Sequence, residues 1–315
     1  MSFDTLLGND RLKQNLAQSI GAGHISHFYL ISGPRGSGKR TLAKLLSAAI
    51  LCRGQHKPCM TCDPCRKLLA GNHPDLITVE DPEHKNVAVK IVRQMRDDMF
   101  VRPNESDYKI YLFPQELGIE GQNALLKILE EPPHYGVFIL LTDNPEKLLP
   151  TVRSRCTELK LQSLPQQILL PHLRREFPQA TQEDLEAAVF RSGGFLGQAM
   201  ELLENGGALP PQTEDFLRAY GGKDPLLLTQ VLTPMEKWKR DQLLEILQSW
   251  LEILEEALAC RSGMTAVSAP ARQLARQRTG EQLHAAIGQV KKALDYGRSN
   301  VSPAAICGYL QWALR

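Results

Sequence analysis

The stretch that decides the fold of this chain runs from residue 33 to residue 41 and reads Gly33-Pro34-Arg35-Gly36-Ser37-Gly38-Lys39-Arg40-Thr41. A phosphate-binding loop has a glycine, any four residues, Gly-Lys, and then Ser or Thr. Gly33, Gly38 and Lys39 match this pattern, and the backbone N–H groups and lysine of such a loop hold phosphate. The hydroxyl position carries Arg40 instead, so the loop lacks the side chain that would bind magnesium. We expect the nucleotide site to be lined by Gly33, Gly36, Gly38, Lys39, Arg40 and Thr41, and binding of ATP or ADP without turnover stays open.

The segments around the loop alternate between strand and helix patterns. The apolar run at 28–32 predicts a buried strand that leads into the loop, and the spacing of apolar residues over 41–51 predicts a helix after it. Further strands are predicted at 76–79, 109–113, 137–141 and 157–161, with helices between them. Buried strands without alternation, interleaved with helices, indicate a mainly parallel sheet covered on both faces. We therefore expect an α/β nucleotide-binding domain over residues 1–164.

The strand pattern stops after residue 164. Residues 165–206 predict a small helical domain, and Gly206-Gly207 with Pro210-Pro211 mark a linker. Residues 210–315 predict an all-α domain with apolar helix faces over 238–260 and 283–294. Such faces usually form intramolecular core, but they also suit an assembly surface, and the sequence does not separate the two.

The composition limits the class of protein. The chain has 315 residues with 37 lysines and arginines against 35 acids, a formal charge of +2, which argues against a free-standing, strongly basic nucleic-acid binder. No apolar run reaches the length that spans a membrane, and the first residues carry no secretory signal, so we expect a cytoplasmic protein.

Four of the seven cysteines form a cluster with the spacing Cys-x6-Cys-x2-Cys-x2-Cys: Cys52, Cys59, Cys62 and Cys65. Thiolates at CxxC spacing converge on one ion, and four of them suit a closed tetrahedral zinc site. The alternatives are four unrelated core cysteines or a redox-active CxxC pair. We expect a structural zinc in a module at 52–65, and we expect His56 to be a solvated loop histidine and not a ligand.

Two further features bear on catalysis. An active nucleotidase needs an Asp-Glu pair after the strand at 109–113, but Pro114-Gln115 follow here, and the nearest carboxylate, Glu116, is expected to be misplaced. Ser154-Arg155-Cys156 precedes the last predicted strand. An arginine there either pairs with a surface carboxylate or projects into the nucleotide site of a neighbouring subunit, where it would stabilise phosphate charge.

Several short segments occur in an order that resembles the bacterial clamp-loader ATPase family of the AAA+ class: Phe3 with Leu7-Gly8, His27-Phe28-Tyr29-Leu30, His73-Pro74-Asp75-Leu76, Asn123-Ala124-Leu125-Leu126-Lys127, Glu130-Glu131-Pro132-Pro133 and Ser154-Arg155-Cys156. The resemblance covers residues 1–205 and reaches the end domain mainly through Asn300-Val301. It implies an AAA+ P-loop domain with a parallel sheet, a small helical lid domain, and an all-α collar domain that holds a ring together. It also implies a hetero-pentamer with gamma or tau and delta subunits, which acts through the complex on the sliding clamp and on primer-template DNA, without a membrane.

Departures from the family pattern favour one branch of it. They are Arg40, Pro114-Gln115, and Gly197-Gln198-Ala199 where Gly-Arg-Ala is expected. Each weakens ATP use and so favours the delta-prime type, an accessory subunit of DNA polymerase III with little or no ATPase activity of its own. For that type, the resemblance implies that Arg155 enters the ATP site of an adjacent gamma or tau subunit. The alternatives are an active ATPase of the gamma or tau type and a zinc-dependent nucleic-acid-binding protein with a vestigial P-loop fold.

Overall fold

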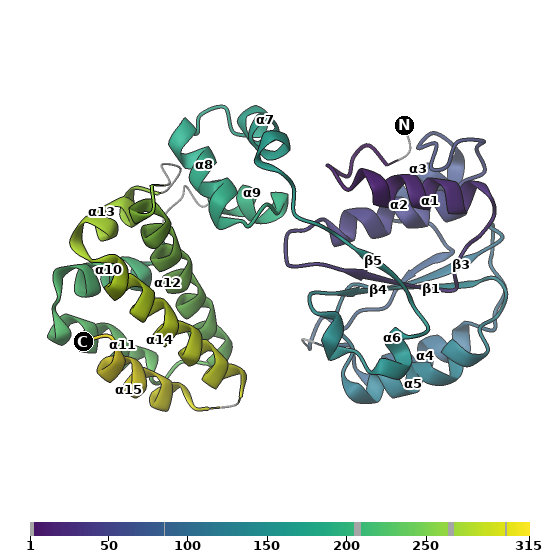
Figure 1. Ribbon diagram of the computed structural model, residues 1–315. Helices are drawn as coiled ribbons and strands as arrows, with labels where there is room; N and C mark the ends of the chain where they lie inside the picture. The colour runs from purple at the N-terminus through teal and green to yellow at the C-terminus, as the bar shows by residue number, and fades with distance from the viewer. Residues whose placement is uncertain (1–2, 85, 205–208, 264–267, 300) are drawn as a thin grey trace. The chain divides into compact units, whose positions relative to one another are not determined.

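The computed structural model describes residues 3–84, 86–204, 209–263, 268–299 and 301–315. The chain forms two compact units, Met1–Ile168 together with Phe195–Gln198, and Leu169–Gly194 together with Ala199–Arg315 (Figure 1). The three-domain division at residues 164 and 206–210 stays a prediction, and the predicted Gly206-Gly207 linker and Asn300 lie outside the described residues.

A five-stranded, all-parallel sheet forms the centre of the first unit. Its strands are β1 Phe28–Ser32, β2 Leu76–Thr78, β3 Lys109–Phe113, β4 Gly136–Thr142 and β5 Thr157–Lys160, in the order β2-β3-β4-β1-β5. All residues of β1 and β4 are buried, as their unbroken apolar runs predict. The predicted strands are confirmed to within one residue at each end.

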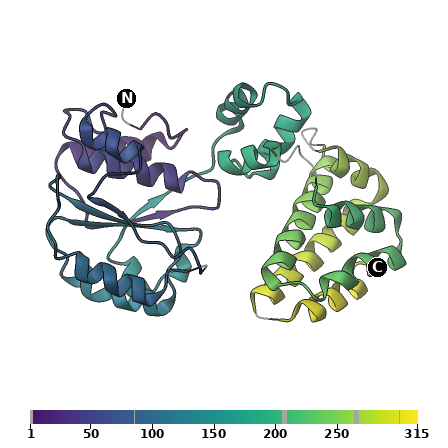
Figure 2. The same cartoon turned by 180° about the vertical axis from the view of Figure 1, so that it is seen from behind.

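Helices cover both faces of this sheet (Figures 1 and 2). One face carries α1 Asp10–Gly21, α2 Lys39–Leu51 and α3 Asp63–Leu69, and the other carries α4 Val89–Asp98, α5 Ile119–Glu130 and the short α6 Pro150–Arg153. Side chains of β1 alternate between the two layers: Tyr29 and Ile31 join the core under α2, and Phe28 and Leu30 join the core under α5. The doubly covered sheet predicted from the sequence is therefore confirmed.

The sheet order brings two strand ends together. β1 and β4 are neighbours in register from Phe28↔Phe138 to Ser32↔Thr142, so the loop that follows β1 lies beside the residues that follow β4. In open parallel sheets, ligands bind at the carboxyl ends of the strands. The loop at 33–39 and the turn that begins at Asp143 occupy that edge.

The second unit is helical throughout the residues described. Its elements are most of α7 Gln166–Glu176, α8 Gln182–Arg191, most of α9 Leu196–Glu204, α10 Pro211–Gly222, α11 Pro225–Met235, α12 Arg240–Arg261, α13 Ala269–Gln277, α14 Gly280–Arg298 and α15 Pro303–Ala313. Trp250 of α12 is fully buried and stacks on Phe216 of α10 with ring centroids 4.0 Å apart. The predicted apolar stripes of α12 and α14 are largely buried against their neighbours, so they serve mainly as core. Across the described part of the chain, no helix has both the length and the apolarity needed to cross a bilayer.

Candidate functional sites

The predicted phosphate loop connects β1 to α2 and has the backbone that its glycines permit. Gly36 and Gly38 have φ angles of 75° and 92°, a region in which a side chain would be strained. α2 begins at Lys39 with Gly38 as its N-cap, and no side chain among the described residues caps it. The first N–H groups of this helix thus point into the loop, which is the arrangement that binds anions.

The lysine of this loop is already engaged by the protein. Lys39 Nζ donates to the carbonyl oxygens of Gly33 at 2.6 Å and Pro34 at 2.8 Å, and to Asp143 Oδ1 at 2.6 Å. An ammonium group has three protons, and these three acceptors use all of them. The side chain of Lys39 is only 12% exposed, whereas that of Asp143 is 60% exposed. Asp143 directly follows β4, so the neighbouring strand supplies the acid that faces the loop.

The start of α9 packs against the same loop. The backbone N–H of Gly197 donates to the carbonyl oxygen of Gly36 at 2.9 Å. A Cβ added at Gly36 would lie 2.5 Å from the backbone nitrogen of Gln198, so the two segments approach at a distance that only glycine allows. Gln198, which stands where the resemblance predicts a sensing arginine, lies at the loop. Arg40 and Thr41 are exposed at the first turn of α2.

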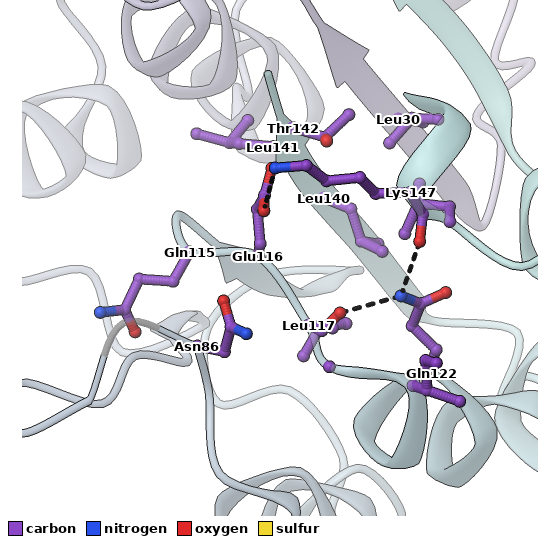
Figure 3. A pocket seen from close by; sticks show the side chains of 13 residues that line it. Leu30, Asn86, Gln115, Glu116, Leu117, Gln122, Leu140, Leu141, Thr142 and Lys147 are labelled. Atoms are coloured by element: carbon purple, nitrogen blue, oxygen red, sulfur yellow. Dashed lines mark hydrogen bonds and ion pairs between the residues drawn. The ribbon is translucent and has the colours of Figure 1, made fainter. Parts of the chain in front are cut away.

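The edge of the sheet at the end of β3 forms a small pocket, and among the described residues that line it Glu116 is the one acid (Figure 3). The amide of Gln115 accepts from the N–H of Asp81 at 2.7 Å and donates to its carbonyl oxygen at 2.9 Å. Glu116 pairs with Lys147 at 2.9 Å across the pocket. The first carboxylate after β3 is thus bound to a lysine.

Gln122 connects three segments around this pocket, and sequence reasoning missed it. Its Nε2 donates to the carbonyl oxygens of Leu117 at 2.8 Å and Lys147 at 3.3 Å (Figure 3). Its Oε1 accepts from the N–H of Leu149 at 2.7 Å. The side chain is 2% exposed. It therefore holds the segment that leads to α6 and to Arg155 against α5.

Arg155 lies at the surface just after α6. It is 41% exposed, its Nη1 donates to the carbonyl oxygen of Thr151 at 2.9 Å, and its Nη2 lies 3.6 Å from Glu130 Oε1 at the end of α5. An exposed ion pair at this distance contributes at most about 1 kcal/mol. The guanidinium is thus oriented by weak contacts and can be withdrawn from them at low cost.

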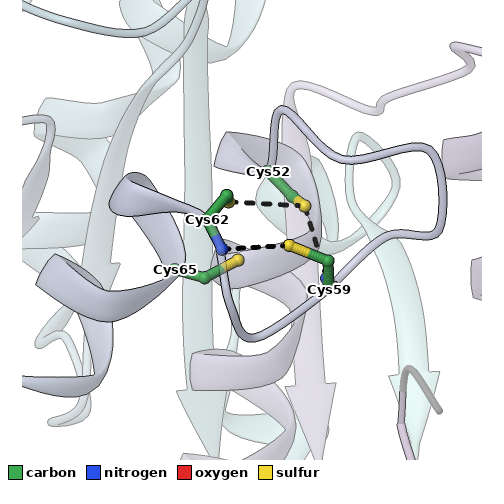
Figure 4. Close-up of side chains that lie close together, drawn as sticks. All are labelled: Cys52, Cys59, Cys62 and Cys65. Atoms are coloured by element: carbon green, nitrogen blue, oxygen red, sulfur yellow. Dashed lines mark hydrogen bonds between the residues drawn. The ribbon is translucent and has the colours of Figure 1, made fainter.

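The four predicted cysteines converge at the end of α2 and the start of α3 (Figure 4). Their sulfur atoms all lie within 4.8 Å of one another, and Cys52 Sγ is 3.8 Å from Cys62 Sγ. Four sulfurs placed about 2.3 Å from a zinc ion at the corners of a tetrahedron are about 3.8 Å apart, so the cluster has the size that zinc requires. All four are free thiols, and His56 is exposed and lies outside the cluster.

The surroundings of the cluster suit thiolates. Backbone N–H groups of Gly54 and Cys59 each lie 3.3 Å from Cys52 Sγ, and that of Cys62 lies 3.3 Å from Cys59 Sγ. Hydrogen bonds from the side chain and backbone of Thr61 lower the pKa of Cys59 to about 5, whereas burial raises the pKa of Cys52 and of Cys65. Buried neighbouring thiols of this kind are stabilised as thiolates by a divalent cation, which would hold the module together.

The fold and the loop define an α/β protein with a parallel sheet and a phosphate-binding loop, with helices alone in the remaining described part of the chain. A family model described as DNA polymerase III, delta subunit, matches residues 8–165, half of the chain. The chain therefore belongs to this DNA polymerase III subunit family, as its resemblance to clamp-loader subunits predicted.

Curated relatives match over more of the sequence. The chain is 34% identical over 200 residues to DNA polymerase III subunit gamma/tau of Mycobacterium tuberculosis, which is 61% of this chain and 35% of that protein. It is 30% identical over 256 residues to subunit tau of Escherichia coli, with 80% of this chain and 38% of that protein covered. The chain thus spans little more than a third of the length of these relatives. A DNA polymerase III gamma subunit-related protein of Thermotoga maritima is similar in structure, at 17% identity, with 96% of this chain and 99% of that chain covered and a TM-score of 0.45.

Proposed function

We propose that the chain is a delta-prime-like clamp-loader subunit that hydrolyses little or no ATP and completes the ATP site of a neighbouring gamma or tau subunit through Arg155. One observation carries this proposal: an exposed, weakly held arginine in the Ser-Arg-Cys segment stands in a chain whose own catalytic groups are replaced.

The residues at the chain's own loop support the first part of the proposal, that the chain hydrolyses little or no ATP. Arg40 stands where a hydroxyl would bind magnesium, and Pro114-Gln115 stand where the acidic pair is expected. Gln115 is bound to the Asp81 segment, and the nearby Glu116 is paired with Lys147. Hydrolysis needs a positioned metal ion and a base that orients water. The backbone donors that hold phosphate in such a loop remain, whereas the groups that turnover needs are replaced.

The position of Arg155 supports the second part of the proposal, that this arginine completes the ATP site of a neighbouring subunit. The phosphoryl group that is transferred at a partner subunit's ATP site carries negative charge in the transition state. An arginine supplied by another chain stabilises this charge and can raise the rate of transfer by a factor of about 10³–10⁵. Arg155 is fixed at its backbone by the turn after α6 and is free to move its side chain away from Glu130. Its partners would be gamma or tau and delta subunits in a five-subunit ring that loads the sliding clamp on primer-template DNA.

The cysteine cluster takes a structural part in this proposal. Four thiolates at tetrahedral spacing leave no open position for substrate, so Cys52, Cys59, Cys62 and Cys65 would hold zinc to fix the loop between α2 and α3.

The test uses the loader assembled from this chain with gamma or tau and delta subunits. Arg155→Ala should lower turnover at the one ATP site that it completes at least tenfold, because that site loses its arginine. The DNA-stimulated ATPase rate of the complex should fall by the share of that site, whereas assembly of the complex stays unchanged. Arg153→Ala is the matched control, since Arg153 is similarly exposed but pairs with Glu146 and Glu158. An ATPase rate that is the same in both variants and the parent would refute the trans role.

A second candidate is an active ATPase of the gamma or tau type, which the 34% identity to gamma/tau relatives favours. Turnover of ATP by the purified chain with magnesium and primed DNA, abolished by Lys39→Ala, would establish this function in place of the first.

A further inference from the structure

The geometry points to Asp143 as an internal anion that takes the place of a nucleotide phosphate at Lys39 and keeps the phosphate loop closed to nucleotide. The inference rests on the proposed function, because it explains how a loop that retains its glycines and its lysine is kept from serving ATP. It concerns this chain's own loop, whereas the proposed function concerns Arg155.

The carboxylate stands where a phosphate oxygen would bind the lysine. Asp143 Oδ1 lies 2.6 Å from Lys39 Nζ, a charge-assisted hydrogen bond of the length that a lysine makes to a phosphate oxygen. The other two protons of the ammonium group go to the carbonyl oxygens of Gly33 and Pro34, which lie at the start of the loop itself. The lysine is therefore held against the loop with no proton left for an incoming phosphate.

The position of Asp143 follows from the sheet and not from a flexible contact. Thr142 is paired with Ser32, the residue before Gly33, through the β1–β4 ladder. The N–H of Gly33 also donates to the carbonyl oxygen of Thr142 at 3.2 Å. The first residue of the loop is thus tied to the residue before Asp143, so an intact sheet keeps the backbone of Asp143 beside the loop.

A bound phosphate would have to lie next to this carboxylate. Two like unit charges 4 Å apart repel by about 1 kcal/mol in bulk water and about 4 kcal/mol near a protein surface. Asp143 is 60% exposed, so the smaller figure applies, and it corresponds to a loss of affinity of about fivefold for each phosphate charge at that distance. Di- and triphosphates carry several such charges, and they also have to displace the three contacts of Lys39.

The loop otherwise keeps hydrogen-bond donors that can bind an anion. The hydroxyl of Ser37 is buried and has no partner among the residues that the structure describes, and the first N–H groups of α2 follow directly. Removal of the single carboxylate should therefore restore a site for a nucleoside diphosphate or for pyrophosphate.

The experiment measures binding of ADP and of inorganic pyrophosphate to the full chain by calorimetry, with and without magnesium. The parent should bind ADP weakly, and Asp143→Asn, which keeps the shape and removes the charge, should bind it at least tenfold more tightly. Asp143→Ser serves as a second neutral variant. Glu146→Gln, an acid in the same turn that pairs with Arg153, is the matched control and should leave the affinity unchanged.

The gain should depend on Lys39, so Lys39→Ala in the Asp143→Asn background should abolish it. The inference is overturned if the two neutral variants fold normally and bind ADP no more tightly than the parent, or if the gain survives the loss of Lys39. These outcomes leave the proposed function standing, because the ATPase test of Arg155 uses sites on other subunits.

Discussion

Replacement of Asp75 by asparagine should destabilise the first unit strongly, although the hydrogen bonds of its carboxylate go to Asn104, Glu105 and Ser106 and not to a candidate site. Its carboxylate is fully buried and accepts four hydrogen bonds: from the backbone and side-chain nitrogens of Asn104 at 2.5 and 3.3 Å, and from the N–H groups of Glu105 and Ser106 at 2.9 Å each. These bonds fix the loop between α4 and β3 to the start of β2.

The magnitude follows from this geometry. An amide can keep one oxygen toward Asn104, but its NH₂ group then faces the two N–H donors of Glu105 and Ser106. Two charge-assisted hydrogen bonds are lost and two donors lose their acceptor, at about 1.5–3 kcal/mol for each bond. We expect Asp75→Asn to lower the free energy of unfolding by about 3–5 kcal/mol.

The effect should depend on pH in a defined direction. Burial by itself would raise the pKa of Asp75, but the hydrogen bonds from Asn104, Glu105 and Ser106 outweigh it and hold the pKa below the ordinary 3.8. A carboxyl whose pKa is lowered by folding stabilises the folded state above its unfolded pKa, and this stabilisation is lost as the pH falls through the folded pKa. The stability difference between parent and variant should be constant above about pH 5 and shrink below about pH 4.

The assay can separate the two units. All three tryptophans, at 238, 250 and 312, belong to the second unit, so tryptophan fluorescence in urea follows that unit, while circular dichroism follows both. Asp75→Asn should move the circular-dichroism transition and leave the fluorescence transition in place. Asp107→Asn, an exposed acid at the same loop, is the control. A shift of less than about 1 kcal/mol at pH 7 would refute the account, because an unsatisfied buried donor costs more than that.

Three further changes give sharp outcomes. Cys62→Ser should remove bound zinc and make the first unit sensitive to heat, whereas Cys260→Ser should retain the metal. Metal analysis of the parent should find about one zinc ion per chain, and a parent that is metal-free and stable to a chelator would contradict this. Gln122→Ala should lower the free energy of unfolding by about 2–3 kcal/mol, because it leaves a backbone N–H and two carbonyl groups without partners. Hydrogen exchange should become faster in the segment at 147–149, and unchanged protection there would count against this account. Gly36→Ala should destabilise by about 1–3 kcal/mol in thermal unfolding, since φ is 75° and the new Cβ would lie 2.5 Å from a backbone nitrogen; an unaltered melting temperature would show that the loop contact is dispensable.

Features that depend on neighbours in the chain were predictable. The glycine spacing of the loop, the buried runs of β1 and β4 and the close spacing of the four cysteines are local patterns, and each appears in the structure where the sequence placed it. The cysteines come together because only a short segment of chain, from the end of α2 to the start of α3, separates them. The apolar stripe of α12 was also visible, but only the packing around Trp250 assigned it mainly to the core of its own unit.

Asp143 and Gln122 escaped sequence reasoning because their partners are distant in the chain. Asp143 meets Lys39 across 104 residues, and Gln122 meets Leu149 across 27. A signal was present in the first case: an acid at the carboxyl end of a buried parallel strand belongs at the ligand-binding edge of the sheet. That rule predicts the edge of the sheet at which Asp143 lies, but it does not predict which strands are neighbours.

The sequence by itself determined the chemistry of the loop: glycines that admit phosphate, a lysine that can bind it, and an arginine where magnesium would need a hydroxyl. The tertiary structure decided what that lysine binds. The order of strands places β4 next to β1, so the residue after β4 reaches the loop after β1. Strand order is set by the packing of whole helices and strands on both faces of the sheet, and no short segment of the chain encodes it.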